Sequence, residues 1–185
     1  VVNEKIFKDN LTNIQFLTNN SLLAIQGPKA ELILKILEIE NDLLFMESKV
    51  CNYLNQSIIV SRSGYTGEDG FEISIPNSII LSFIQLIMKI DSLKLCGLGS
   101  RDSLRLEAGL SLYGNELNEN ITPIEANLSW SIHKERLSDP RLNGQKILLS
   151  QFNNGTNKLK IGIQSKSKSI LRSNMKMSSK VLHIK

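Results

Sequence analysis

The apolar residues of this chain recur at two spacings, one typical of strands and one typical of helices. Over residues 71–75, apolar side chains alternate with Glu72 and Ser74, which predicts a strand with one apolar and one polar face. A second apolar run, 58–60, precedes a segment with three glycines, and the two runs are predicted to form a β-hairpin whose glycines supply positive φ in the turn. A lone carboxylate on a strand face usually has water or a partner against it, and we expect this of Glu72.

Helical spacing appears on either side of this hairpin. A buried strand is predicted over 21–26, and the Gly-Pro pair after it begins a helix that runs to about Glu40. A second helix is predicted to run from Asn77 or Ser78, either of which is a suitable N-cap, to about Ile90. Strand, hairpin and helix in this order predict an α+β fold, with a mixed or antiparallel sheet and packed helices.

Residues 97–109 predict a tight glycine loop followed by a helix. The helix is expected to begin near Ser100, to bury a stripe that includes Leu104, and to end at Gly109 as its C′ residue. Arg101 lies outside that stripe, in the first turn, where a cation is unfavourable to the helix dipole. We therefore expect Arg101 to have an acidic or a ligand partner, and an ion pair within the chain is as good an explanation as a ligand.

The last third of the chain predicts a change of organisation. Apolar residues alternate over 128–132, which predicts a buried strand with Trp130 in the core. The charged and polar stretch that follows is typical of a linker, and the basic, alternating segment after it is predicted to begin a small β-rich domain. The expected domains are a core over 1–133, a linker over 134–156 and the start of a C-terminal domain over 157–185.

Composition and charge exclude several classes of protein. With 41% hydrophobic and 22% charged residues, the 185-residue chain is an ordinary globular sequence, and no run approaches the ~20 apolar residues of a membrane helix. Residues 157–185 carry eight lysines or arginines and no acid, so the remainder holds 14 basic against 18 acidic residues. No aromatic residue lies among those cations to stack on bases, so a solvated strand is preferred to a nucleic-acid surface.

Metal, thiol and imidazole chemistry have little support in the sequence. Cys51 and Cys96 have no metal-binding spacing, and we expect both in the core of a protein from a reducing compartment. His133 and His183 have no second ligand or nucleophile at a useful spacing, so both are assigned to structure. No phosphate-loop, dinucleotide or metal motif is present, and no metal is expected.

Four blocks of the chain together resemble the glycine cleavage system T protein family, the tetrahydrofolate-dependent aminomethyltransferases. The blocks are Ser-Leu-Leu-Ala-Ile-Gln-Gly-Pro at 21–28, Gly-Tyr-Thr-Gly-Glu-Asp-Gly-Phe-Glu-Ile at 64–73, the glycine loop and helix at 97–109 with its continuation 112–116, and the segment 122–130. The resemblance covers about residues 19–132. It implies a three-domain disc around a folate pocket, of which this chain would be a part.

The resemblance also implies an activity and a site. In the family, an aminomethyl group carried by the lipoyl arm of H protein is passed to tetrahydrofolate and ammonia is released. The carboxylate that matches Glu72 binds the pterin, the arginine that matches Arg101 lies beside it, and Tyr65 is a suitable wall for the flat ring. The family's catalytic carboxylate precedes the first matched strand. Lys8-Asp9 echoes it among residues that depart from the family pattern, so Asp9 is a candidate and the catalytic residue stays unassigned.

Two alternatives stay open on the sequence. One is an inert T-protein relative that serves as a structural component of a larger assembly. The other is the folate-binding domain of a demethylating dehydrogenase, which would require a flavin domain upstream. The family further implies location in the mitochondrial matrix if the source is eukaryotic, otherwise in the cytoplasm, with no nucleic-acid or membrane partner.

Overall fold

A computed structural model of the chain describes residues 16–166, 168, 170–172 and 175. The predictions for Asp9 and His183 lie outside the described residues. The chain divides into two compact units, Val1–Leu110 and Ser111–Lys185, each described here by itself. The predicted domain division at 133 and 156 stays a prediction.

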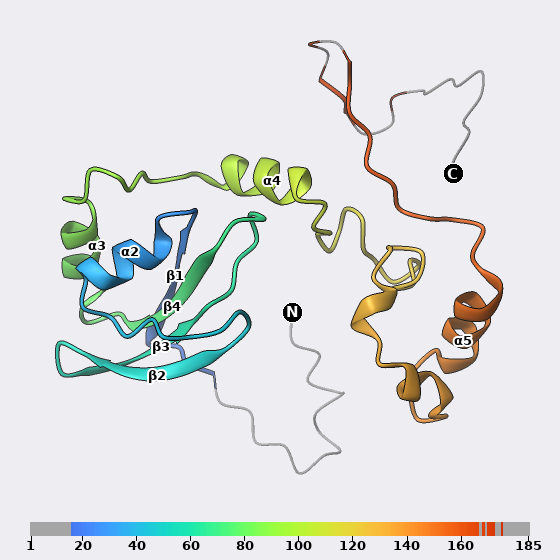
Figure 1. Ribbon diagram of the computed structural model, residues 1–185, viewed down its shortest axis with the longest axis horizontal. Coiled ribbons are helices and arrows are strands. Elements are labelled where there is room, and N and C mark those ends of the chain that lie inside the picture. The colour runs from blue at the N-terminus through green and yellow to red at the C-terminus, as the bar shows by residue number, and fades with distance from the viewer. Residues whose placement is uncertain (1–15, 167, 169, 173–174, 176–185) are drawn as a thin grey trace. The chain divides into compact units, whose positions relative to one another are not determined.

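The first unit contains one four-stranded antiparallel sheet (Figure 1). Its strands are β1 (Asn20–Gln26), β2 (Ser48–Tyr53), β3 (Gln56–Ser61) and β4 (Gly70–Pro76), in the order β1-β4-β3-β2. The predicted hairpin is therefore β3 and β4, and β1 pairs with β4 from the other side. This confirms the antiparallel alternative of the predicted sheet.

One face of this sheet and two helices form the core of the first unit. The alternation read from the sequence is confirmed, because Phe71, Ile73 and Ile75 are fully buried while Glu72 and Ser74 are half-buried. Apolar side chains of helices α2 (Ala30–Ile36) and α3 (Ile80–Ile87) belong to the same buried cluster. Burial of aliphatic and aromatic side chains on this scale is the main force that holds a domain of this size together.

Both helices are shorter than predicted. After α2 the N–H of Glu38 bonds to Lys35 O and the N–H of Ile39 bonds to Leu34 O, with Glu38 at a φ of 55°. This is a Schellman motif, which usually has glycine at the left-handed position. Because glutamate occupies that position here, the sequence contains no signal that the helix ends there. Helix α3 begins after Ile79, and neither Asn77 nor Ser78 is its N-cap.

The second unit is small and has no strand among its described residues. It contains two short 3-10 helices, η1 (Ser129–Ser131) and η2 (Lys134–Ser138), and helix α5 (Gln145–Asn154). Its buried cluster consists of Ile124, Leu137 and Leu148.

Two predictions for this unit are wrong. Residues 128–132 contain η1 instead of a strand, and Trp130 is 80% exposed. The cause is local: Asn127 has a φ of 60°, and the N–H of Ser131 then bonds back to Leu128 O, which closes a turn where a strand was expected. Residues 158–163 likewise have no regular secondary structure. In the described part of the chain, no helix is long and apolar enough to cross a membrane.

Candidate functional site

Glu72 lies on the sheet face opposite the core, between two short side chains. Its register partners are Ala24 of β1 and Ser61 of β3, so neither neighbour crowds the carboxylate. Ser63 Oγ donates a hydrogen bond to Glu72 Oε2 at 2.7 Å. Among the described residues this is the one hydrogen bond that the Glu72 carboxylate makes, so Oε1 is free to accept another.

Two of the three hairpin glycines leave room for a neighbouring side chain and are not required by the backbone conformation of the turn. Gly67 alone of the three has a positive φ, 81°, so the predicted role of Gly64 and Gly70 in the turn is wrong. The end of the Gln26 side chain lies against both of them, and a Cβ on Gly64 would fall 1.9 Å from Gln26 Oε1. Gln26 Nε2 donates to Ser63 O at 3.1 Å and to Phe71 O at 3.3 Å, which ties the end of β1 to both arms of the hairpin.

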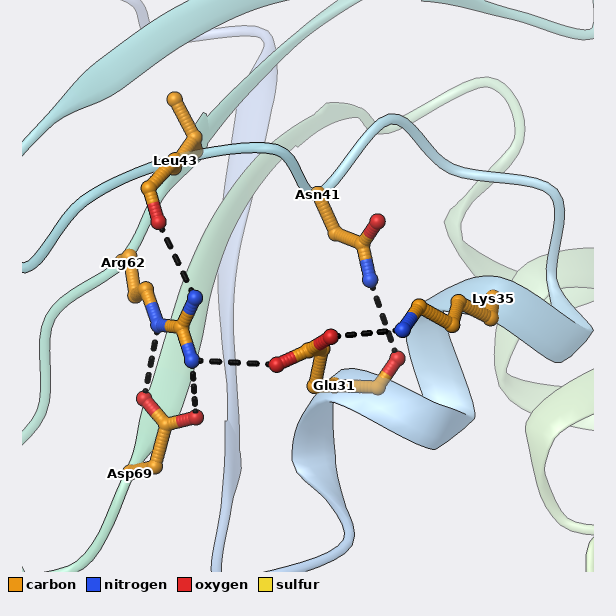
Figure 2. A network of polar contacts seen from close by, with 6 residues as sticks. All are labelled: Glu31, Lys35, Asn41, Leu43, Arg62 and Asp69. Atoms are coloured by element: carbon orange, nitrogen blue, oxygen red, sulfur yellow. Dashed lines mark hydrogen bonds and ion pairs between the residues drawn. The ribbon is translucent and has the colours of Figure 1, made fainter.

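A guanidinium joins the two ends of the same hairpin loop (Figure 2). Arg62 Nε and Nη2 donate to the two carboxylate oxygens of Asp69 at 3.0 and 2.7 Å. Arg62 Nη2 also donates to Glu31 Oε2 of α2 at 3.1 Å, and Nη1 donates to Leu43 O at 3.0 Å. The hydrogen-bonded Arg62 lowers the pKa of Asp69 below its ordinary value, and Lys35, followed by Arg62, lowers the pKa of Glu31.

The tip of the hairpin meets helix α4 (Leu98–Glu107), which the sequence predicted within two residues. The Arg101 guanidinium lies over the Tyr65 ring, 5.0 Å from its centroid. A Cβ on Gly67 would lie 2.8 Å from Ala108 Cβ, so the tip and the end of the helix are in close contact. No carboxylate of the described residues forms an ion pair with Arg101; its partner is an aromatic face, which the prediction did not include.

The buried residue of α4 is Arg105, which the sequence reasoning missed. Arg105 is 3% exposed, whereas Leu104, which was predicted to face inward, is 40% exposed. Arg105 Nε donates to Asp102 Oδ1 at 2.9 Å and Nη1 donates to Leu110 O at 3.1 Å. The spacing of Asp102 and Arg105, three residues apart on a helix, was the available signal. Gly109, at a φ of 73°, ends the helix as predicted.

A cavity of about 720 Å³ lies between the end of β1, the start of α2 and the segment 92–104. Among the described residues, the charged side chains that line it are Lys29, Lys94 and Arg101, and none of the lining residues is a carboxylate. The size falls within the range of small-molecule sites. Of the predicted binding residues only Arg101 lines this cavity; Tyr65 contacts Arg101, and Glu72 lies outside the lining.

The two cysteines differ in burial. Cys51 is buried in the sheet, as predicted, and burial raises the pKa of its thiol. Cys96 is exposed on the cavity lining, which corrects the prediction that it lies in the core. Within the described residues, no group of three or more His, Cys, Asp or Glu side chains could hold a metal ion.

Comparison with known proteins places these features in a family. The family model of the GCVT N-terminal domain matches residues 3–136, nearly three quarters of the chain. The chain belongs to this family. The GCVT match includes the hairpin, α4 and the segment 122–130, so the resemblance to the glycine cleavage T protein is confirmed.

Several curated relatives of this chain are named aminomethyltransferase. The mitochondrial aminomethyltransferase of Dictyostelium discoideum is 43% identical over 166 residues, which cover 82% of this chain and 41% of the relative. That of Homo sapiens is 41% identical over 148 residues, covering 78% of this chain and 37% of the relative. The chain thus spans about two fifths of the length of these curated relatives.

A solved structure supports the fold as well. The crystal structure of the glycine cleavage system aminomethyltransferase T from Bartonella henselae matches with a TM-score of 0.65 and 38% sequence identity. The match covers 74% of this chain and 37% of that one. The mixed α/β architecture with an antiparallel sheet is therefore that of a T protein, while the three-domain disc and the C-terminal domain stay predictions.

Proposed function

We propose that this protein is a tetrahydrofolate-dependent aminomethyltransferase of the glycine cleavage system. It would move the one-carbon unit of aminomethyl-lipoyl H protein to tetrahydrofolate with release of ammonia. The observation that carries the proposal is the contact of the hairpin tip with α4, which brings Tyr65 and Arg101 together in a chain of this family. The names of the relatives support the transferase class.

The side chains of the first unit fit a pterin. The ring presents N–H donors and a flat aromatic face, which suit a carboxylate and a stacking wall. Glu72 has one oxygen free among the described residues and the other fixed by Ser63, so its orientation is set before any ligand arrives. Arg101 adds a donor at the cavity wall, and Tyr65 adds an aromatic face next to it.

Catalysis in this proposal is electrostatic and orienting. Glu72 and Arg101 hold the pterin, so that the reacting nitrogen of the folate meets the aminomethyl group in one geometry. Asp9 stays a candidate for the catalytic carboxylate, and it lies outside the described residues. The lipoylated H protein is the proposed partner, and the mitochondrial matrix is the proposed location for a eukaryotic source, following the names of the relatives.

The test uses the purified protein, tetrahydrofolate and aminomethylated H protein. We expect tetrahydrofolate to bind and methylenetetrahydrofolate to form, and Glu72→Gln to weaken tetrahydrofolate binding at least tenfold because it removes the charge that accepts the pterin N–H groups. Glu107→Gln is the matched control, since Glu107 is an exposed carboxylate of α4. Failure to bind tetrahydrofolate and to form product would refute the proposal. Binding without transfer would favour the inert relative.

A further inference from the structure

Arg62 connects three segments of the first unit that are distant in sequence. Its side chain bonds to Asp69 at the far end of the hairpin loop, to Glu31 in α2, and to the carbonyl of Leu43 in the loop before β2 (Figure 2). Its backbone is held as well, because the N–H of Met46 donates to Arg62 O at 2.8 Å and the N–H of Arg62 donates to the carbonyl of Glu47 at 2.9 Å. Arg62 therefore attaches the hairpin loop to α2 and to the loop before β2.

The bond to Asp69 closes the loop that carries Tyr65. The two parallel N–H···O bonds fix direction as well as distance, which a single point charge cannot do. The same guanidinium lies 5.3 Å from the centroid of the fully buried Phe71, the residue next to Glu72. Arg62 thus touches both the loop before β4 and the first residues of β4 itself.

The burial of Arg62 and its two bonds to Asp69 distinguish this pair from the surface ion pair nearby. The side chains of Arg62 and Asp69 are 24% and 37% exposed, whereas those of Lys35 and Glu31, which form an ion pair through a single bond, are 59% and 40% exposed. Exposed pairs of that kind contribute little, because water screens them and both side chains lose rotamer freedom. A half-buried, bidentate pair with two further hydrogen-bond partners holds its geometry much better.

We propose that Arg62 is a positioning residue that fixes the hairpin loop, so that Tyr65 lies against Arg101 and Glu72 stays aligned with Ser63. The proposal rests on the proposed function in one respect, that these residues meet the folate. Arg62 itself need not touch a ligand. It acts through Asp69 and Phe71, and the charge of lysine at this position would not replace its fork of donors.

The experiment compares Arg62→Lys with Lys35→Met, a control that removes a cation from the exposed edge of the same network. Hydrogen exchange of the ligand-free protein is measured at the Gly27 amide, which donates to Asp69 O at 2.8 Å, and at the amides of β4. We expect Arg62→Lys to speed exchange at Gly27 at least tenfold and to leave the β4 amides within twofold. Lys35→Met should leave both unchanged.

The folate readout is the KM and kcat of aminomethyl transfer. We expect Arg62→Lys to raise the KM for tetrahydrofolate five- to twenty-fold with kcat within threefold, because the binding groups are displaced and the chemistry is not. Unchanged Gly27 exchange, or equal acceleration throughout β4, would overturn the proposal, as would an unchanged KM. If Arg62→Lys does not fold, Asp69→Asn decides by the same readouts. If the unaltered protein does not bind tetrahydrofolate, the proposed function fails, and the exchange comparison still decides the role of Arg62.

Discussion

The contact of Gln26 with Gly64 predicts that the effect of Gly64→Ala on the free energy of unfolding changes sign when Gln26 is also replaced. A Cβ on Gly64 would lie 1.9 Å from Gln26 Oε1, and φ at Gly64 is not in the left-handed region, so the conflict is with the amide and not with the backbone. The amide can swing away, but it then loses its bonds to Ser63 O and Phe71 O.

The magnitude follows from those two bonds. At about 0.5–1.5 kcal/mol for each net hydrogen bond, Gly64→Ala should lower the free energy of unfolding by about 1–3 kcal/mol, and Gln26→Ala should cost a similar amount. In the Gln26→Ala background the amide is absent, so the methyl group that Gly64→Ala adds does not clash with it. There Gly64→Ala should be neutral or stabilise by about 0.4–1 kcal/mol, because alanine restricts the unfolded chain.

The assay is urea unfolding followed by far-UV circular dichroism on the four proteins of this double-mutant cycle. We expect a coupling free energy of about 1–4 kcal/mol between the two positions, the difference between the effects of Gly64→Ala in the two backgrounds. Gly162→Ala is the control, since a Cβ there meets nothing within 4 Å, and it should change stability by less than about 0.5 kcal/mol. An equal cost of Gly64→Ala in both backgrounds would show that Gln26 is not what excludes a side chain at Gly64.

Three further predictions concern charge, turn geometry and thiols. Because Arg62 lowers the pKa of Asp69 in the folded state, this pair stabilises the fold above about pH 4, and the stabilisation is lost as pH falls. The melting temperature measured from pH 6 to pH 2 should therefore fall more steeply for the unaltered protein than for Asp69→Asn. Melting temperatures that fall in parallel would contradict this. Gly67→Ala, at a φ of 81° and against Ala108, should lower the free energy of unfolding by about 1–2 kcal/mol in urea, and an unaffected midpoint would refute the tip contact. Ellman's reagent should react quickly with the exposed Cys96 thiol and with the buried Cys51 thiol only on unfolding. Rapid reaction of both thiols in the folded protein would contradict this prediction.

The sequence predicted β1, β3 and β4 because strand signals are local, whereas it did not place β2. Alternation over 71–75 placed Phe71 in the core and Glu72 on the opposite face, as the structure has them. The same rule failed at Trp130, where three apolar residues also alternate, because a left-handed Asn127 turned the chain into a 3-10 helix. Period-two alternation over five residues does not by itself distinguish a strand from a tight turn.

For the candidate site, the sequence predicted individual residues but not the contacts between them. Glu72, Arg101 and Tyr65 came from motifs, but their partners depend on tertiary contacts that spacing does not encode. Arg62 bonds to Glu31 across 31 positions, and Gln26 bonds to Ser63 across 37. An arginine that the fold buries partly, like Arg62, or almost fully, like Arg105, appears in a sequence as one more surface cation, which is why neither was singled out.

The strand order has a consequence for the order of folding. β2, β3 and β4 are successive neighbours and can pair as the chain collapses, whereas β1 pairs with β4 across a register that joins Asn20 to Pro76. Closing so long a loop is slow relative to forming a hairpin. We therefore expect β1 to join the sheet last and to bring Gln26 with it. The hairpin that carries Tyr65 and Glu72 would then reach its final shape only in the closing step of folding, so incompletely folded chains would lack the site altogether.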